Sequence, residues 1–266
     1  MLITSTENAK VAEVAKLLDK KYRKASGLYL IEGERLVSDA LMHGAEITEI
    51  FVKESAMQKI HFDNAIFVAD KVFAKMSDTV TSQGVVAVVK KRQGAPVPPK
   101  GNCLVLDGLQ DPGNVGTLIR TAAACAFTDI YAVNTVDLYS PKVLRSAMSA
   151  HFCLNLWQTE NLQETFQLLK DCAIVAADMK GANVFSSKFH GKVALVLGNE
   201  GNGLSEFSRK AVQQTVSLPM ENNFESLNVA VAGSVIMYQI YAQTQTSNYR
   251  RQNIYVRSQQ MEQHKK

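Results

Sequence analysis

Short apolar runs, separated by segments with helical spacing, divide the chain into two parts. Between residues 11 and 18 the apolar positions recur every three or four residues, which predicts a helix that begins near Ser5 or Thr6. Short strands are expected at LYLIEG, EIFV, AIFVA and GVVAVVK, with helices at RLVSDALMHG and KVFAKMSD. The first part therefore predicts a small mixed α/β unit.

The second part alternates strands and helices more regularly. Apolar runs predict strands at residues 104–107, 130–133, 152–157, 173–178, 193–198 and 215–220. Helices are expected at residues 116–126, 142–150, 161–171, 205–213 and 226–243. This alternation is typical of an α/β fold with a mostly parallel sheet covered on both faces. Ligands of such sheets bind beyond the carboxyl ends of the strands, so we examined the segments that follow them.

A proline-rich segment, KKRQGAPVPPKG at residues 90–101, separates the two parts. Pro96, Pro98 and Pro99 favour extended backbone, which indicates a semi-rigid linker. We therefore expect four sections, at residues 1–92, 93–101 (linker), 102–247 and 248–266 (basic tail). The tail is expected to be flexible or to extend an RNA-binding surface.

Composition restricts the class of protein without indicating a function. The 266 residues are 46% hydrophobic and 20% charged, which excludes disordered and fibrous chains. No apolar run is long enough for a membrane span, and MLITSTENAK lacks the pattern of a signal peptide. The four cysteines form no CxxC and no Cys/His pairing, which argues against zinc and against a disulfide framework. We expect a cytoplasmic protein without a metal or a membrane partner.

The distribution of charge is more informative than the net charge of +4. The middle of the chain is mildly acidic, and both flanks are basic. The basic clusters include Lys20, Lys21, Arg23, Lys24 near the start and Arg250, Arg251, Arg257 in the tail. Basic flanks could bind nucleic acid, and solvated helix faces would give the same pattern.

The segment after strand 104–107 reads DGLQDPGNVGTLIRTAAACAF. Asn114 can cap a helix, and Gly116 allows another segment to approach the backbone closely. Arg120 then lies among small residues, which is unusual for a solvated helix face. It could bind a ligand, extend its charged end to solvent or pair with an acid.

The segment after strand 193–198 reads NEGNGLSEFSRK. Gly198, Gly201 and Gly203 would let backbone amides and carbonyls face a ligand directly. Their spacing matches neither the P-loop nor the dinucleotide-binding fingerprint, and Glu200 is unfavourable beside phosphate. A phosphate-binding loop is therefore disfavoured.

The segment after strand 215–220 reads ENNFESLNVAVAGSVIMYQIYAQ. Pro219 ends the strand, and Ser226 or Asn228 can begin the next helix. That helix is apolar on nearly every side, so we expect it to be buried in the core or against another subunit. Simple capping is the alternative role for both polar residues.

Together, NVGTLIRTAAACAF, LVLGNEGNGLS and LPMENNFESLNVAVA resemble the three motifs of the SpoU/TrmH family of RNA 2′-O-ribose methyltransferases, in the SPOUT superfamily. The resemblance covers about residues 102–243. LYLIEGERLVSDAL and SQGVVAVV also resemble the family's ribosomal-protein-like substrate-binding domain. The resemblance implies a C-terminal trefoil knot, although chains are generally unknotted. It also implies S-adenosylmethionine as cofactor, and a homodimer with each active site at the interface.

The resemblance assigns catalytic roles to Asn114, Arg120, Glu200, Ser226 and Asn228. It assigns cofactor contacts to Ala177, Gly198, Asn199, Gly201, Leu218, Met220 and Leu227. Lys20, Lys21, Arg23, Lys24 and Arg35 are expected to bind RNA. Because a guanidinium stays protonated, we expect Arg120 to bind a phosphate and polarise the 2′-hydroxyl, while Glu200, Arg120 or water takes the proton.

The substrate-binding domain favours ribosomal RNA over tRNA, but it names no nucleotide. A non-catalytic RNA-binding or ribosome-assembly factor could use the same fold, although intact Arg120 and Glu200 argue against it. A nucleotide-dependent oxidoreductase is disfavoured because the dinucleotide fingerprint is missing.

Overall fold

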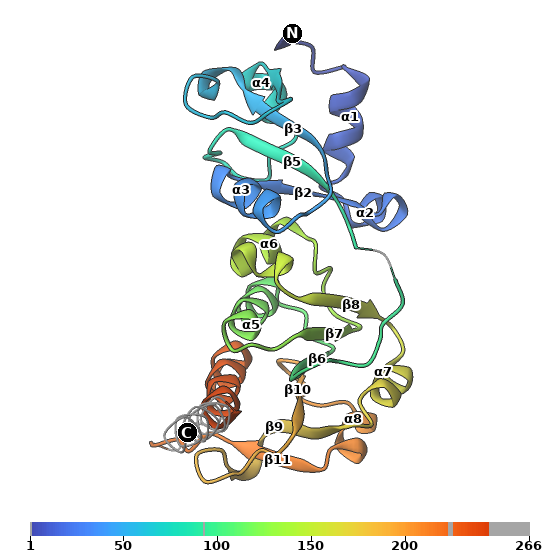
Figure 1. Ribbon diagram of the computed structural model, residues 1–266, viewed down its shortest axis with the longest axis vertical. Coiled ribbons are helices and arrows are strands. Elements are labelled where there is room, and N and C mark those ends of the chain that lie inside the picture. Colours follow the sequence, from blue (N-terminus) through green and yellow to red (C-terminus); the bar gives the residue numbers. More distant parts are fainter. Residues whose placement is uncertain (1, 93, 223–225, 245–266) are drawn as a thin grey trace, which may run out of the picture. The chain divides into compact units, whose positions relative to one another are not determined.

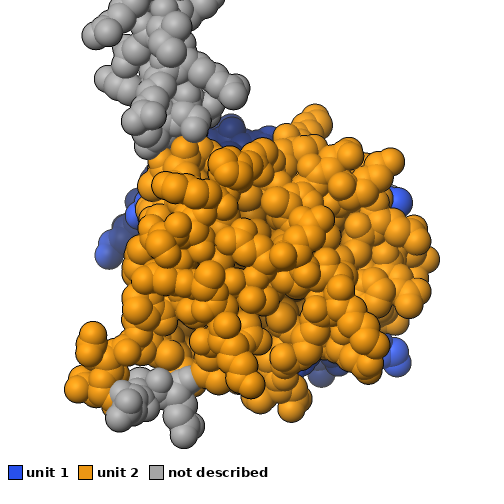
Figure 2. All heavy atoms as spheres, turned by 90° about the horizontal axis from the view of Figure 1, so that it is seen from below, with its two compact units in different colours: residues 1–96, 110–120, 135–156 blue, residues 97–109, 121–134, 157–266 orange. Residues whose placement is uncertain are grey.

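The computed structural model describes residues 2–92, 94–222 and 226–244. The described chain contains two separate sheets with their helices (Figure 1). It divides into two compact units, coloured in Figure 2: unit 1 comprises residues 1–96, 110–120 and 135–156, and unit 2 comprises residues 97–109, 121–134 and 157–266. The predicted basic tail, with Arg250, Arg251 and Arg257, lies outside the described residues.

The first ninety residues form a five-stranded sheet in the order β1-β4-β3-β5-β2. β2 and β3 run antiparallel to β5, whereas β4 is parallel to β1 and β3. The elements are β1 (Leu2–Ile3), α1 (Ala9–Lys16), α2 (Lys20–Ser26), β2 (Leu28–Glu32), α3 (Glu34–Met42), β3 (Ile47–Lys53), the 3-10 helix η1 (Glu54–Ala56), β4 (Ile66–Val68), α4 (Asp70–Phe73) and β5 (Val85–Lys90).

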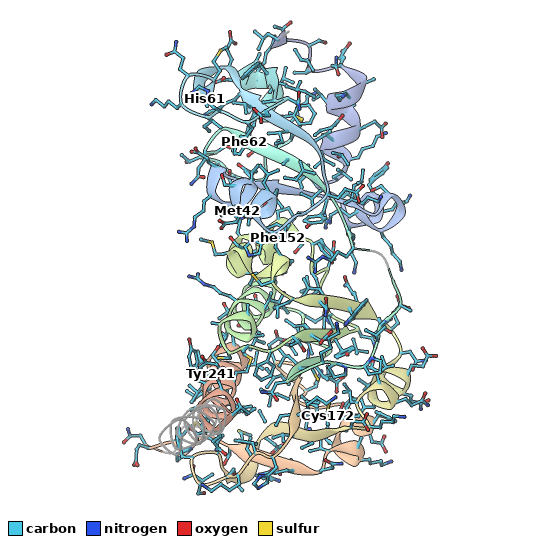
Figure 3. The ribbon with its side chains drawn as sticks, viewed as in Figure 1. Met42, His61, Phe62, Phe152, Cys172 and Tyr241 are labelled. Atoms are coloured by element: carbon cyan, nitrogen blue, oxygen red, sulfur yellow. The ribbon has the colours of Figure 1, made fainter. Side chains whose placement is uncertain are left out.

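Both faces of this sheet are buried. On β5, Val86 and Val88 face the core beneath α1, while Val85, Ala87 and Val89 face the core on the side of α3. Phe152 and the partly buried Phe62 belong to the second core (Figure 3). Burial on two faces explains why β5 reads as an almost continuous apolar run rather than an alternating one.

The two N-terminal helices differ from the prediction. Asn8 caps α1, since its side chain accepts hydrogen bonds from the amides of Lys10 and Val11, so the helix begins after the predicted Ser5 or Thr6. The second helix, α2, was not predicted, because its sequence KKYRKAS has no apolar repeat. It is capped by Asp19 and ends at Gly27 in the left-handed conformation.

The structure contradicts the predicted RNA contact of Arg23 on α2. Its side chain is buried, with Nε 2.7 Å from the Asp137 carboxylate and a second nitrogen donating to the Leu17 carbonyl at 2.7 Å. A buried guanidinium needs such partners to offset its desolvation. Arg23 therefore anchors α2 to the segment that carries Asp137 and is not available to RNA, whereas Lys20, Lys21, Lys24 and Arg35 are exposed.

His151 lies buried in unit 1 and is expected to make the stability of this unit depend on pH. Its Nε2 is 2.7 Å from the Leu138 carbonyl, and its Nδ1 has no hydrogen-bond partner among the described residues. Burial lowers the pKa of His151 from 6.5 to about 4, against the opposing effect of that carbonyl. Between pH 6.5 and pH 4, His151 is therefore protonated in the unfolded chain but stays neutral in the folded chain. The free energy of unfolding should fall by up to about 3 kcal/mol between pH 6.5 and pH 4.

Denaturant unfolding of His151→Gln at several pH values measures this effect, because glutamine does not titrate. We expect a flatter dependence on pH than in the unsubstituted protein. His61→Gln is the matched control, since His61 is exposed, and it should retain the original slope. An unchanged slope in His151→Gln would contradict the assignment.

The second sheet has six strands in the order β11-β9-β10-β6-β7-β8. β6 pairs in parallel with β7 and β10, and β9 pairs in parallel with β10 and β11. The elements are β6 (Cys103–Asp107), α5 (Pro112–Ala124), β7 (Asp129–Val133), α6 (Pro141–Ala147), the 3-10 helix η2 (Met148–Phe152), β8 (Asn155–Thr159), α7 (Leu162–Leu168), β9 (Cys172–Asn183), β10 (Lys192–Gly198), α8 (Glu206–Ala211) and β11 (Gln214–Ser217). Residues 229–244 are also helical.

This arrangement confirms the predicted mostly parallel α/β sheet. Strands β8 and β9 differ from the prediction in where they begin or end. η2 occupies the beginning of the predicted strand 152–157, so β8 begins at Asn155. β9 continues to Asn183, because its pairing with β11 resumes after an irregularity between Thr215 and Val216. Among the described residues, no helix has both the length and the apolar composition needed to cross a membrane.

Candidate active site

A pocket of about 530 Å³ lies in unit 2, beside β9 and the segments that follow β10 and β11. Every residue predicted to contact the cofactor lines it, namely Ala177, Gly198, Asn199, Gly201, Leu218, Met220 and Leu227. The predicted catalytic residues Glu200, Ser226 and Asn228 also line it, whereas Asn114 and Arg120 are not among its lining residues. The fold thus brings together predicted residues that are dispersed over 52 positions of the sequence, from Ala177 to Asn228.

Asn199 builds the glycine-rich loop after β10. Its Nδ2 donates to the Gly108 carbonyl at 2.9 Å, and its Oδ1 accepts from the amides of Gly201 and Asn202, each at 3.0 Å. Its backbone exchanges two hydrogen bonds of 2.9 Å with Gly203, which has a φ of 66°. The side chain predicted to contact the cofactor therefore also holds the loop in its closed form.

Asp107, at the carboxyl end of β6, is a supporting residue that the sequence analysis missed. Its buried carboxylate accepts from the Ser205 amide at 2.9 Å and from the Ser208 hydroxyl at 2.7 Å. These hydrogen bonds fix the beginning of α8 and, with it, the end of the glycine-rich loop. The sequence signal was an acidic residue closing the apolar strand LVLD.

The pocket combines an apolar wall with a charged edge. Leu218, Met220, Leu227 and the buried Ile236 contribute apolar surface. At the edge, a guanidinium nitrogen of Arg209 lies 3.6 Å from the Asp178 carboxylate, and its Nε donates to the Leu204 carbonyl at 3.0 Å. The Arg209–Asp178 pair was not predicted, because it forms only where α8 lies close to β9 in the fold.

Asn228 caps the helix that covers the pocket. Its Oδ1 accepts from the amides of Ala230 and Val231 at 2.9 and 3.3 Å, and its carbonyl accepts from Ala232 at 2.9 Å. The capping role considered for this residue is therefore confirmed, in addition to its place in the pocket lining. Ser226 is exposed and lies in the same lining.

Asn114 and Arg120 both lie on α5. Asp111 caps this helix, accepting from the Asn114 amide at 2.8 Å, so Asn114 lies inside the first turn rather than at the predicted cap position. A Cβ on Gly116 would approach Ser146 Cβ to 2.4 Å, which confirms the predicted close approach of another segment. Arg120 is exposed. The next residue, Thr121, shares a 3.0 Å hydrogen bond with Ser234 of helix 229–244.

The described residues contain no cluster of three or more histidine, cysteine and acidic side chains suited to a metal ion. The lining of the pocket presents a glycine-rich loop, apolar walls and several polar side chains to a ligand.

Comparison with known proteins decides the family. Residues 101–238 match the SpoU rRNA methylase family, and residues 8–87 match the MRM3-like substrate binding domain. The chain belongs to the SpoU rRNA methylase family. This result confirms the resemblance drawn from the three motifs, and with it an RNA 2′-O-ribose methyltransferase that uses S-adenosylmethionine.

SpoU relatives match nearly the whole chain. It is 33% identical over 255 residues to an uncharacterized tRNA/rRNA methyltransferase of Synechocystis, covering 89% of this chain and 92% of that one. It is 31% identical over 245 residues to the 23S rRNA (guanosine(2553)-2′-O)-methyltransferase RlmP of Bacillus subtilis, covering 90% and 98%. The solved structure of the SpoU methyltransferase AviRb from Streptomyces viridochromogenes, in complex with AdoMet, superimposes with a TM-score of 0.80 at 26% identity, covering 90% and 98%.

Proposed function

We propose that this SpoU enzyme methylates a ribose 2′-hydroxyl of large-subunit ribosomal RNA in the cytoplasm. The pocket of unit 2 carries the proposal, because every predicted cofactor residue lines it. The substrate-binding domain at residues 8–87 and the 23S rRNA activity named for the Bacillus subtilis relative support ribosomal RNA over tRNA.

The pocket residues fit S-adenosylmethionine. Their cavity of about 530 Å³ lies within the range of small-molecule sites, roughly 300–1,000 Å³. Leu218, Met220 and Leu227 offer an apolar wall to the adenine ring, and the amides of the loop that begins at Gly198 can read its polar edge. When bound, the cofactor supplies a methyl group activated by its sulfonium.

Two side chains are proposed to act on the RNA. Arg120 binds the phosphate beside the target ribose and donates a hydrogen bond to the 2′-oxygen, which stabilises the negative charge that develops there. Glu200 accepts the hydroxyl proton, directly or through water. Asn114, Ser226 and Asn228 are the other residues proposed to take part in catalysis.

The active form is proposed to be a homodimer built on a C-terminal trefoil knot. Helix 229–244 supports the dimer, since Val231 and Tyr238 are 51% and 54% exposed and lie seven residues apart on one side of the helix. Leu227, at the pocket wall, is also exposed. A second copy covering this face would bury these side chains and place its own residues next to the pocket.

Methyl transfer from labelled S-adenosylmethionine to ribosomal RNA tests the function. Ribose methylation should also be mapped in a strain that lacks the gene and in its parent. We expect label in large-subunit RNA, and loss of one 2′-O-methylation in the deletion strain. If the purified protein binds RNA but no rRNA or tRNA site changes, a non-catalytic RNA-binding factor is the better assignment.

A further inference from the structure

A second concave site lies in unit 1 and shares no lining residue with the cofactor pocket. It is a groove of about 630 Å³ between α1, α2 and the sheet (helices labelled in Figure 1). Val14, Leu17, Leu28 and Val88 give it an apolar floor. Tyr22 lines the groove and is 41% exposed, and the Lys16 ammonium lies 5.7 Å from the centroid of its ring.

The charged side chains on the walls of the groove neutralise one another. Lys10 lies 2.6 Å from Glu49, and Lys16 lies 2.6 Å from Glu13. Glu13 raises the pKa of Lys16 through this hydrogen bond and its charge. The interior therefore suits an uncharged, flat, apolar group better than a phosphate.

The outer surface of α2 is positively charged, in contrast to the neutral interior of the groove. Lys20, Lys21 and Lys24 are exposed on this helix, which also carries Tyr22. A neutral groove with an aromatic ring, bordered by ammonium groups, matches an unstacked nucleobase with phosphates on either side. An acidic peptide would also be attracted to the lysines, but it would not require the aromatic ring.

The groove is also held in a defined shape. Buried Arg23 attaches α2 to Asp137 and to the Leu17 carbonyl, as described above. At the other end of the helix, the Ser26 hydroxyl donates to the Tyr22 carbonyl at 2.8 Å and accepts from the Leu28 amide at 3.1 Å. A ring on so constrained a helix loses little conformational entropy when a base stacks on it.

We infer that this groove binds an unstacked base of single-stranded RNA, stacked on Tyr22, with the neighbouring phosphates at Lys20, Lys21 and Lys24. The inference rests on the proposed function for RNA as the substrate, and it identifies single-stranded rather than double-helical RNA as the form that unit 1 recognises. Arg23, in the middle of the basic run, takes a structural role in this site.

Binding of the full-length protein to a short single-stranded RNA and to a duplex of the same sequence tests the inference. We expect Tyr22→Ala to weaken single-strand binding about tenfold and to leave duplex binding within about twofold. Tyr22→Phe keeps the ring and should bind like the unsubstituted protein, whereas Tyr22→Leu keeps only apolar surface and should behave like Tyr22→Ala. Affinity for S-adenosylmethionine, measured in the same samples, should be unchanged and reports that unit 2 is intact, while the retained duplex binding reports that unit 1 is folded.

The lysines give an independent measurement. Replacing Lys20, Lys21 and Lys24 with glutamine should reduce the slope of log affinity against log salt by about 2, because each lost phosphate contact of single-stranded RNA contributes about 0.7. Lys59→Gln, an exposed lysine on another segment, is the control and should keep the slope.

Three results would overturn the inference: full single-strand binding by Tyr22→Ala, full binding by Tyr22→Leu, or an unchanged salt slope in the triple variant. The second would indicate an apolar contact such as a peptide. If the variants behave as expected but the unsubstituted enzyme transfers no methyl group to RNA, the proposed function fails while the RNA groove stands.

Discussion

Replacing Arg120 with alanine is expected to lower methyl transfer to RNA by about 1,000-fold, which is the usual effect of removing a donor that stabilises a developing oxyanion. Affinity for S-adenosylmethionine should stay within about twofold, because Arg120 is not among the residues that line the cofactor pocket. The side chain is exposed on α5, so its removal leaves no cavity in the core. Single-turnover transfer of a labelled methyl group and cofactor titration measure the two quantities separately.

Two further variants show whether the loss of methyl transfer comes from the missing guanidinium. Arg120→Lys keeps the positive charge but lacks the planar fork of donors, so it should recover only part of the activity. Arg145→Ala is the matched control, since Arg145 is an exposed arginine whose ion pair with Asp78 lies on the surface, and it should retain nearly full activity. Undiminished turnover in Arg120→Ala would remove Arg120 from the reaction, and a parallel loss of cofactor affinity would indicate a structural role.

The parallel sheet was predictable because its strands are buried on both faces. Residues 103–106 and 193–198 read as uninterrupted apolar segments, and the helices between them have regular spacing. The pocket followed from the rule that ligands bind at the carboxyl ends of such strands, together with the family motifs. The family was thus apparent from the motif segments, because each follows a strand that its own apolar pattern predicts.

The features that were missed depend on partners far away in the sequence. Arg23 looked like one more basic surface residue, and only the distant Asp137 makes it an anchor. Asp107 organises the glycine-rich loop through Ser205 and Ser208, about a hundred positions later in the chain, which no local pattern reveals. Asn199 was expected only to contact the cofactor, because the hydrogen bonds that make it a loop-forming residue appear only once the loop is closed. Arg23 and Asn199 were candidates and Asp107 was not, and for all three the distant partners determine the role.

Replacing Gly198 with alanine should greatly weaken cofactor binding by deforming the loop itself. A Cβ at this position would lie 2.3 Å from the backbone carbon of Gly203 and 2.4 Å from the Leu204 amide nitrogen. Neither atom belongs to a flexible side chain, so the two hydrogen bonds between Asn199 and Gly203 must open to make room. We expect the free energy of unfolding to fall by about 1–3 kcal/mol, as in other overpacked sites. Affinity for S-adenosylmethionine should fall by about 100-fold or more, since a loss of 2.8 kcal/mol or so of binding energy corresponds to that factor.

Gly201→Ala on the same loop separates crowding from the general effect of adding a methyl group. There the nearest atom to a new Cβ would be Asn199 Oδ1, at 3.7 Å, which is an ordinary contact. The free energy of unfolding should therefore change by less than about 0.5 kcal/mol, and the loss of cofactor affinity should be much smaller than in Gly198→Ala. Thermal unfolding and calorimetric titration with S-adenosylmethionine measure both variants under the same conditions. Equal losses in the two variants would show that the loop tolerates no added side chain anywhere, and normal cofactor binding by Gly198→Ala would show that the Gly198–Gly203 approach does not shape the pocket.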